Sequence, residues 1–198
     1  MTGRLHLGHL VNAVYVWGLV RALNGQVVLR LEDHDRGRFR PEYETAILDD
    51  LEWLGLVPDL GSITGFRGGA SPYRQSDGAE RYETALDELR TRGLTYACEC
   101  SRASQVRAAG DEEGRYPGRC RARGLSEERG RRIRVRMDPG VELFVDLGAG
   151  PAAQDPSAQC GDLVARDVAG DWSYQFAVVV DDLAQGITLV IRGLDLLA

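Results

Sequence analysis

Apolar residues recur at helical spacing near the start of the chain, from Leu10 to Leu23. Leu10, Val14 and Trp17 fall on one face of a helix with 3.6 residues per turn. The density of apolar side chains along this stretch predicts a buried helix. Gly25 follows the last periodic residue and is expected to end the helix, because glycine is favoured just beyond a helix C-terminus.

The rest of the chain alternates between helical and extended patterns. One helix is predicted from Pro41 to Leu54 and another from Ser76 to Arg92, which Gly93 closes. The stretch from Ser173 to Asp182 fits either a helix or a strand. Five further segments are predicted to be strands: Gln26–Leu31, Leu94–Ala97, Arg132–Met137, Val141–Leu147 and Ile187–Ile191. This alternation favours an α/β fold.

The composition is that of an ordinary globular protein, with 198 residues, 43% of them hydrophobic and 27% charged. Apolar runs such as Ala177–Val180 stop far short of the roughly 18 residues that a membrane-spanning helix needs. The first eight residues include Gly3, Arg4, His6 and Gly8, whereas a secretory signal has a basic start followed by an unbroken apolar stretch. We therefore expect a cytoplasmic protein that makes no membrane contact.

The charge is unevenly distributed. The formal net charge is −6, and all 24 basic residues are arginine, nine of them between Arg115 and Arg136. An acidic protein does not coat nucleic acid through bulk charge, but a local basic face can contact it. A solvated surface explains the same nine arginines, and both interpretations stay open.

Three of the four cysteines lie close together in the sequence. Cys98 and Cys100 are separated by one residue, and Cys120 follows after about twenty mostly polar residues. In a cytoplasmic chain such residues are ligands or core thiols more often than disulfides. Ordering the intervening loop costs entropy unless something ties its ends together. Cys160 stands alone and is expected to be a core or surface thiol.

Two short motifs hold the three histidines. His6-Leu7-Gly8-His9 lies at the start of the first predicted helix, where backbone N–H groups and the helix dipole favour a phosphate. The string Arg30–Asp35 follows the first predicted strand, where open α/β sheets bind ligands. The alternatives are helix-terminal histidines without a ligand and a solvated acidic turn.

Four segments carry a resemblance to a known family. Met1–His9 resembles the Pro-Thr-Gly-x-Leu-His-Ile-Gly-His stretch of class I glutamyl-tRNA synthetases, and Arg30–Asp35 resembles their Arg-Ile-Glu-Asp-Thr-Asp. Tyr174–Asp182 and Gly186–Leu196 resemble late segments of their catalytic domain. The matches run in the family's order along essentially the whole chain. The resemblance implies a class I aminoacyl-tRNA synthetase fold, with a Rossmann-like parallel sheet and a zinc-bearing insertion.

Within that family, the segment Ala177–Asp182 and the cysteine segment look most similar to the short paralogues, the glutamyl-Q tRNA(Asp) synthetases. Their zinc site reads Cys-x-Cys followed by Tyr-x-x-x-Cys, which matches Cys98, Cys100, Tyr116 and Cys120. The resemblance implies one structural zinc ion, although a tyrosine lies outside the usual ligand list. Zinc would also tie the ends of the polar loop. Three unligated thiols remain the alternative.

The resemblance implies a reaction as well. A carboxylate of glutamate would attack the α-phosphorus of ATP, bound with Mg²⁺, to give glutamyl-adenylate, and glutamate would then pass to queuosine in the anticodon of tRNA(Asp). His6, Gly8 and His9 would form the ATP site.

The resemblance also assigns the glutamate-binding residues. Glu32 would hold the α-ammonium group, while Tyr174 and Arg192 would bind the carboxylates. Asp195 matches a motif position to which we assign no role.

The family pattern extends beyond this chain in both directions. It has a strand before the Thr2-Gly3 match and a Lys-Met-Ser-Lys-type loop after the last match, and this chain has no lysine. We therefore expect a catalytic-domain fragment, truncated at both ends. The predicted organisation is a first half of the catalytic domain (1–97), a zinc-binding and acceptor-type insertion (98–160) and a return to the catalytic domain (161–198).

Two other functions remain open. The first is the N-terminal catalytic part of a glutamyl-tRNA synthetase that charges tRNA(Glu). The second is a non-catalytic, zinc-dependent RNA-binding fragment that uses Cys98–Cys120 and the Arg115–Arg136 stretch. The second would not explain the retention of His6, His9 and Glu32. We expect a monomer whose partners are glutamate, ATP and tRNA(Asp).

Overall fold

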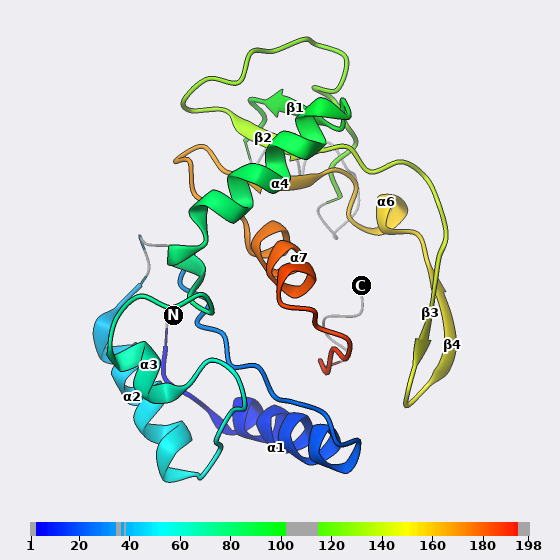
Figure 1. Cartoon of the computed structure of the whole chain (residues 1–198). Helices are drawn as coiled ribbons and strands as arrows, with labels where there is room; N and C mark the ends of the chain where they lie inside the picture. The colour runs from blue at the N-terminus through cyan, green and yellow to red at the C-terminus, as the bar shows by residue number, and fades with distance from the viewer. Residues whose placement is uncertain (1–2, 35–36, 38, 102–114, 194–198) are drawn as a thin grey trace. The chain divides into compact units, whose positions relative to one another are not determined.

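The computed structural model describes residues 3–34, 37, 39–101 and 115–193. The chain forms two compact units, of which the first combines the chain up to Tyr82 with the stretch that starts at Val180. The second runs from Glu83 to Val179. Two helices, α4 (Ala79–Thr91) and α7 (Tyr174–Ala184), cross the divisions between the units (Figure 1). The domain boundaries expected at residues 97 and 160 stay a prediction.

The first predicted helix is α1 (Leu7–Ala22), but it is not a buried helix. Trp17 and Val20 are buried, whereas six apolar residues along it and just beyond are exposed: Leu7, Val11, Val14, Tyr15, Leu19 and Leu23. Apolar side chains surround the whole helix, while the first unit packs only against one stripe of it, around Val27. The density of apolar residues was therefore misleading about burial.

The end of α1 also differs from the expectation in detail. Asn24, rather than Gly25, takes the left-handed conformation, with φ of 55°. The Gly25 N–H donates to the Val20 carbonyl at 2.8 Å, and the Asn24 N–H donates to that of Arg21 at 3.1 Å. These two bonds form a Schellman motif, in which asparagine can replace glycine.

The core of the first unit is made by helices near its middle. The second predicted helix is confirmed as α2 (Pro41–Trp53), which contacts the short helix α3 (Ile63–Arg67) (Figure 1). Leu48 and Leu51 of α2 pack with Ile63 and Phe66 of α3 in a buried apolar cluster. The 3₁₀ turn η1 (Gln75–Asp77) precedes α4 and, with it, accounts for the third predicted helix.

The parallel sheet expected in this unit appears only as isolated pairings among the described residues. Val28 forms a parallel bridge with Leu60, and Leu31 forms one with Arg74. The predicted strand Ile187–Ile191 is not a strand, and within the described chain its backbone has no ladder partner. Apolar, β-branched composition makes a segment extended, but a strand also needs a neighbour to supply its hydrogen bonds.

The second unit is built on antiparallel strands. Among the described residues, β1 (Thr95–Cys98), β2 (Arg132–Val135) and β5 (Leu163–Arg166) form a sheet in the order β1-β2-β5. Thr95 pairs with Val135 and Cys98 with Arg132. These pairings confirm the strands predicted at 94–97 and 132–137.

A separate hairpin joins β3 (Glu142–Asp146) and β4 (Gly150–Gln154) and is followed by the short helix α6 (Pro156–Gln159) (Figure 1). The strand predicted at 141–147 is thus confirmed as β3. β4 was not predicted, since its Gly-Pro-Ala-Ala-Gln sequence lacks β-branched residues. The ambiguous stretch from Ser173 is resolved as helix α7. In the part of the chain that the structure describes, no helix combines the length and apolar character needed to cross a bilayer.

Candidate functional site

The two histidines of the first motif cap the start of α1. The His6 Nδ1 atom accepts the Gly8 N–H at 3.1 Å, and the His9 Nδ1 atom accepts the His6 N–H at 3.3 Å. Their rings stack with centroids 3.8 Å apart. A Cβ on Gly8 would lie 3.0 Å from the His6 ring, so glycine leaves room for this cap. Since both Nδ1 atoms accept hydrogen bonds, each neutral ring carries its proton on Nε2 and can donate from there.

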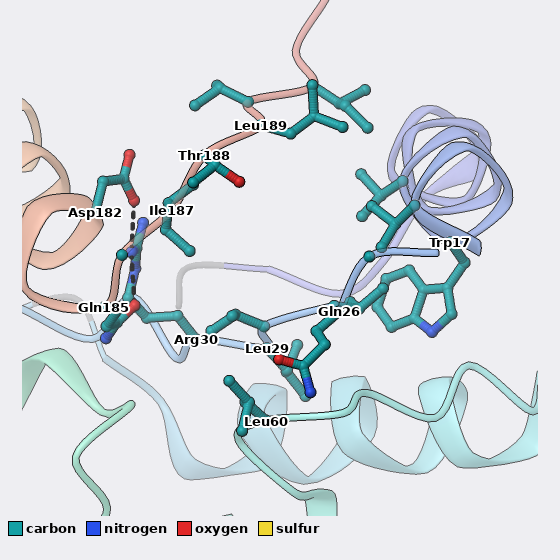
Figure 2. Close-up of a pocket in the computed structure, with 18 of the residues that line it drawn as sticks. Trp17, Gln26, Leu29, Arg30, Leu60, Asp182, Gln185, Ile187, Thr188 and Leu189 are labelled. Carbon is teal, nitrogen blue, oxygen red and sulfur yellow. Dashed lines mark hydrogen bonds and ion pairs between the residues drawn. The ribbon is translucent and has the colours of Figure 1, made fainter. Parts of the chain in front are cut away.

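The first unit contains a cavity of about 640 Å³. Its wall comes from α1, from the extended segment 25–32 and from the segment 182–192. Figure 2 shows Arg30, Asp182 and Gln185 on one side of it and Trp17 on the other. Glu32 and Arg192, two of the three predicted glutamate-binding residues, both line this cavity.

Arg30 is the centre of the charged part of the cavity wall. Its Nη1 donates to Asp182 at 2.7 Å and to Gln185 at 3.1 Å (Figure 2). Its Nη2 donates to Glu32 at 3.3 Å. Burial opposes the charge on Arg30, but the hydrogen bond to Asp182 and the charge of Glu32 raise the guanidinium pKa overall. Arg192 lies 4.0 Å from the other Asp182 oxygen. The wall thus presents two cations and two carboxylates.

The buried carboxylate of Asp181 holds the Arg30 side chain in place, and Asp181 is not itself among the described residues that line the cavity. It is fully buried and accepts hydrogen bonds from Gln75 at 2.9 Å, from Tyr82 at 2.8 Å and from Arg81. The Arg30 Nε lies 3.8 Å from the same carboxylate. Burial and the hydrogen bond to Asp181 raise the pKa of Tyr82, which keeps the phenol protonated as a donor. The cavity wall is therefore anchored to η1 and α4 through a single carboxylate.

The acidic residues after Arg30 face two different environments, the cavity and the buried interior. Glu32 lines the cavity, whereas the next residue, Asp33, is buried and accepts from the Ser76 N–H at 2.8 Å and from Arg74 at 3.1 Å. Alternate residues of an extended chain point to opposite sides, which explains the division. The family resemblance had singled out Glu32 and assigned no role to Asp33.

Two predicted site elements, the histidine motif and Tyr174, are not among the described residues that line this cavity. Among the described lining residues, His6, Gly8 and His9 are absent, although Asn12 on the same helix is present. Tyr174 begins α7 in the second compact unit and is 40% exposed, so the cavity of the first unit is described without it. Asp195 lies outside the described residues.

The four residues of the predicted zinc site lie together in the second unit. The Tyr116 Oη is 3.3 Å from the Cys98 Sγ and 3.6 Å from the Cys100 Sγ, and the Cys100 and Cys120 sulfurs are 3.6 Å apart. All three sulfurs lie within 4.8 Å of one another. Cys98, Tyr116 and Cys120 are buried in one cluster. Cys160 is half-buried at the end of α6 and lies outside this group.

These distances fit a tetrahedral metal ion. Zn–S bonds of about 2.3 Å place the sulfurs of a tetrahedral site about 3.8 Å apart, close to the 3.6 Å between the Cys100 and Cys120 sulfurs. Burial opposes ionisation of Cys120, but hydrogen bonds, first from Tyr116, lower the pKa of its thiol to about 7. Burial raises the pKa of Cys100 and that of Tyr116. The donor set is therefore suitable for zinc, with one thiol already near ionisation at neutral pH.

The backbone at Tyr116 packs closely against the backbone at Gly161. Tyr116 forms a parallel bridge with Gly161, whose φ is +65°, and a Cβ at that position would lie 2.2 Å from the Tyr116 carbonyl oxygen. Only glycine fits both conditions. No sequence pattern predicts this contact, because the two residues are far apart along the chain.

Most of the arginines between Arg115 and Arg136 have structural partners. Arg121 pairs with the buried Asp162, Arg123 lies 2.6 Å from Glu99, and Arg131 donates to Ser126. Arg134 is buried against Tyr116. These contacts explain much of the arginine density without a nucleic-acid partner.

Sequence reasoning placed Arg30 in a candidate ligand-binding segment but assigned no individual role to Arg30, Asp182 and Gln185, or to the anchor Asp181. Two signals could have found them. Arg30 interrupts an apolar segment, and the pair Asp181-Asp182 follows three consecutive valines in a helix. Charged residues in otherwise buried elements are expected to have partners, because an unpaired buried charge is costly.

Comparison with known proteins identifies the family. The whole chain, residues 1–198, matches the model of the family described as tRNA synthetases class I (E and Q), catalytic domain. It is 41% identical to the glutamyl-Q tRNA(Asp) synthetase of Nitratidesulfovibrio vulgaris over its full length and 64% of that protein. It is 38% identical to the glutamate–tRNA ligase of Frankia casuarinae over 97% of the chain and 39% of that protein.

A solved structure gives the same result for the fold. The crystal structure of the glutamate-tRNA synthetase from Elizabethkingia anophelis matches with a TM-score of 0.79 and 29% identity, over 99% of this chain and 43% of that one. This match confirms the α/β fold expected from the resemblance, at the level of the class I glutamyl-tRNA synthetase architecture. The chain belongs to the family of class I tRNA synthetase catalytic domains (E and Q).

Proposed function

We propose that the protein activates glutamate with ATP to give glutamyl-adenylate and transfers the glutamate to queuosine in the anticodon of tRNA(Asp). The similarity to a glutamyl-Q tRNA(Asp) synthetase supports this reaction, although the chain spans less than two thirds of that relative. The observation that carries the proposal is the presence of Glu32 and Arg192 in one cavity. Glutamate carries one ammonium group and two carboxylates, so a site that binds it needs a carboxylate and at least one cation.

In this proposal Glu32 binds the α-ammonium group and Arg192 binds a carboxylate of glutamate. A guanidinium can hold a carboxylate through two parallel hydrogen bonds, which favours glutamate over an uncharged side chain. Tyr174 contributes a further hydrogen bond to the substrate, a role that rests on the family resemblance alone. The cavity volume is within the usual range for small-molecule sites.

His6, Gly8 and His9 are proposed to bind the phosphates of ATP, which enters with Mg²⁺. The two imidazoles direct Nε2 donors outward from the start of α1, where the helix dipole favours an anion. Attack by a carboxylate on the α-phosphorus needs no general base. The work of these residues is to position the phosphates and to stabilise charge on their oxygens.

Cys98, Cys100, Tyr116 and Cys120 are proposed to hold one structural zinc ion. The ion would be coordinated by all four residues in a closed tetrahedral site, which would link the two ends of the polar loop. The proposal is supported by the sulfur and oxygen spacings described above. No catalytic step passes through this site.

A second candidate is a glutamate–tRNA ligase that charges tRNA(Glu). The similarity to the Frankia ligase, which is only slightly lower in identity, favours it. The resemblance to the short paralogues implies that glutamate is activated without tRNA. A pyrophosphate-exchange assay run with and without tRNA therefore separates the two candidates. The purified chain is mixed with ATP, labelled pyrophosphate and glutamate, with and without tRNA.

We expect glutamate-dependent exchange of pyrophosphate into ATP in the absence of tRNA. A strict requirement for tRNA would transfer the assignment to the ligase. Exchange that depends on neither glutamate nor tRNA, or no exchange under either condition, would contradict activation by this chain.

A further inference from the structure

Arg134 is a buried cation with few partners. Its side chain lies on β2 and is only 2% exposed. Nη1 donates to the Asp162 main-chain carbonyl at 2.7 Å, but Nε and Nη2 are buried without a hydrogen-bond partner in the described part of the chain. No carboxylate that the structure describes lies within ion-pair distance of it. Such a residue is costly unless a nearby negative charge compensates it.

Asp162, whose main-chain carbonyl contacts Arg134, has a carboxylate that is already paired with other groups. Asp162 accepts from Arg121 at 2.6 Å, from the Met137 N–H at 2.9 Å and from Tyr96 at 2.5 Å. Only its main-chain oxygen contacts Arg134. The negative charge that balances Arg134 must therefore come from another direction.

The other neighbour of Arg134 is the cysteine cluster. The guanidinium carbon lies 3.6 Å from the centroid of the Tyr116 ring, in a cation–π stack. The Oη of the same ring contacts the Cys98 and Cys100 sulfurs. With zinc bound, three thiolates outweigh the two positive charges of the metal, so the loaded site is net negative whether or not Tyr116 is ionised.

We propose that Arg134 is the buried counter-ion and positioning residue of the metal-loaded cysteine cluster. Its charge balances the thiolates across the Tyr116 ring, and its stacked face holds that ring with Oη toward the sulfurs. This inference rests on the proposed zinc site and adds a residue that touches no metal. Partners that orient metal ligands commonly contribute 10- to 100-fold to metal affinity.

The test measures zinc affinity of the purified chain by competition with a chelator, for the wild type and for Arg134→Met. Methionine keeps an unbranched side chain of similar length and removes the charge. We expect about 10- to 100-fold weaker zinc binding. The metal-free variant should melt no lower than metal-free wild type, because an uncompensated buried charge has been removed. The zinc-induced rise in melting temperature should be smaller.

Two further variants complete the test. Arg131→Gln is the matched control, since Arg131 lies in the same unit, pairs with Glu128 at 3.6 Å and donates to Ser126 rather than to the cluster, and zinc affinity should change less than about threefold. Arg134→Lys keeps the charge and should recover part of the affinity lost in Arg134→Met. If the methionine variant does not fold, Arg134→Gln makes the same comparison.

A merely structural role would lower the melting temperatures of the metal-free and zinc-loaded forms equally and leave zinc affinity unchanged. That result would overturn the proposal while leaving the zinc site intact. Absence of zinc binding by the wild type would overturn both the zinc site and the role of Arg134.

Discussion

The cysteine cluster takes its side chains from one stretch of sequence, Cys98–Cys120. The charged cavity instead joins segments that are far apart in the sequence, with Glu32 near the start of the chain and Asp182 and Arg192 near its end. The first arrangement depends on a loop whose ends a metal can tie. The second depends on ion pairs between distant segments. Short spacing can therefore reveal a ligand set, while the partners within a cavity appear only in the folded chain.

The largest effect is expected at the cysteine cluster. Cys100→Ser should abolish stoichiometric zinc binding, because a hydroxyl is a poor replacement for a thiolate, and should expose the loop to protease. Zinc content and limited proteolysis measure this. Cys160→Ser is the control and should retain about one zinc per chain, since Cys160 lies outside the cluster. Stoichiometric zinc in Cys100→Ser would remove Cys100 from the site.

The cavity gives the next effect. Arg192→Ala should lower kcat/KM for glutamate by about 30- to 1000-fold, or roughly 2 to 4 kcal/mol, because a substrate carboxylate loses its charge-assisted hydrogen bonds. Kinetics for ATP and zinc content should not change. Arg67→Ala is the control, since Arg67 pairs with the exposed Asp49 in the same unit. Unchanged glutamate kinetics, or an equal loss for ATP, would make Arg192 a structural residue.

The anchor of the cavity wall should affect stability. Asp181→Asn removes a buried charge that accepts hydrogen bonds from three side chains, and we expect a loss of about 3 kcal/mol in the free energy of unfolding. Urea denaturation measures it. Asp49→Asn, which changes an exposed ion pair, should cost less than about 1 kcal/mol. Equal losses for the two variants would show that Asp181 does not anchor the wall.

The smallest effect concerns the start of α1. Burial and the neighbouring His6 lower the pKa of His9 below its ordinary value of 6.5. A lowered histidine pKa means that the unfolded state binds the proton first. The contribution to stability is therefore present above pH 6.5 and is lost as the pH falls from there toward the folded pKa. NMR titration should show this lowered pKa, and His6→Gln should raise it. A His9 pKa unaffected by His6→Gln would argue against the stacked pair.

The sequence predicted those features that depend on local chemistry. Pro41 placed the start of α2 correctly, and the family resemblance grouped Cys98, Cys100, Tyr116 and Cys120, which the structure brings together. In the first case a local propensity suffices, and in the second a motif confined to one stretch of the chain does.

The errors depend on tertiary structure. The apolar residues of α1 predicted burial, but packing covers only the stripe that contains Trp17 and Val20. Ile187–Ile191 has strand composition without a strand partner in the described chain. Arg30 and Asp182 could not be paired from the sequence, because their contact joins segments whose order along the chain contains no sign of their proximity.

The most direct test of the proposed function follows labelled glutamate into tRNA. The purified chain is incubated with ATP, labelled glutamate and one of three acceptors: tRNA(Asp) that contains queuosine, tRNA(Asp) that lacks it, or tRNA(Glu). We expect label only on the queuosine-containing tRNA(Asp), and none without ATP. Label on tRNA(Glu), or on tRNA(Asp) regardless of queuosine, would contradict the proposed function.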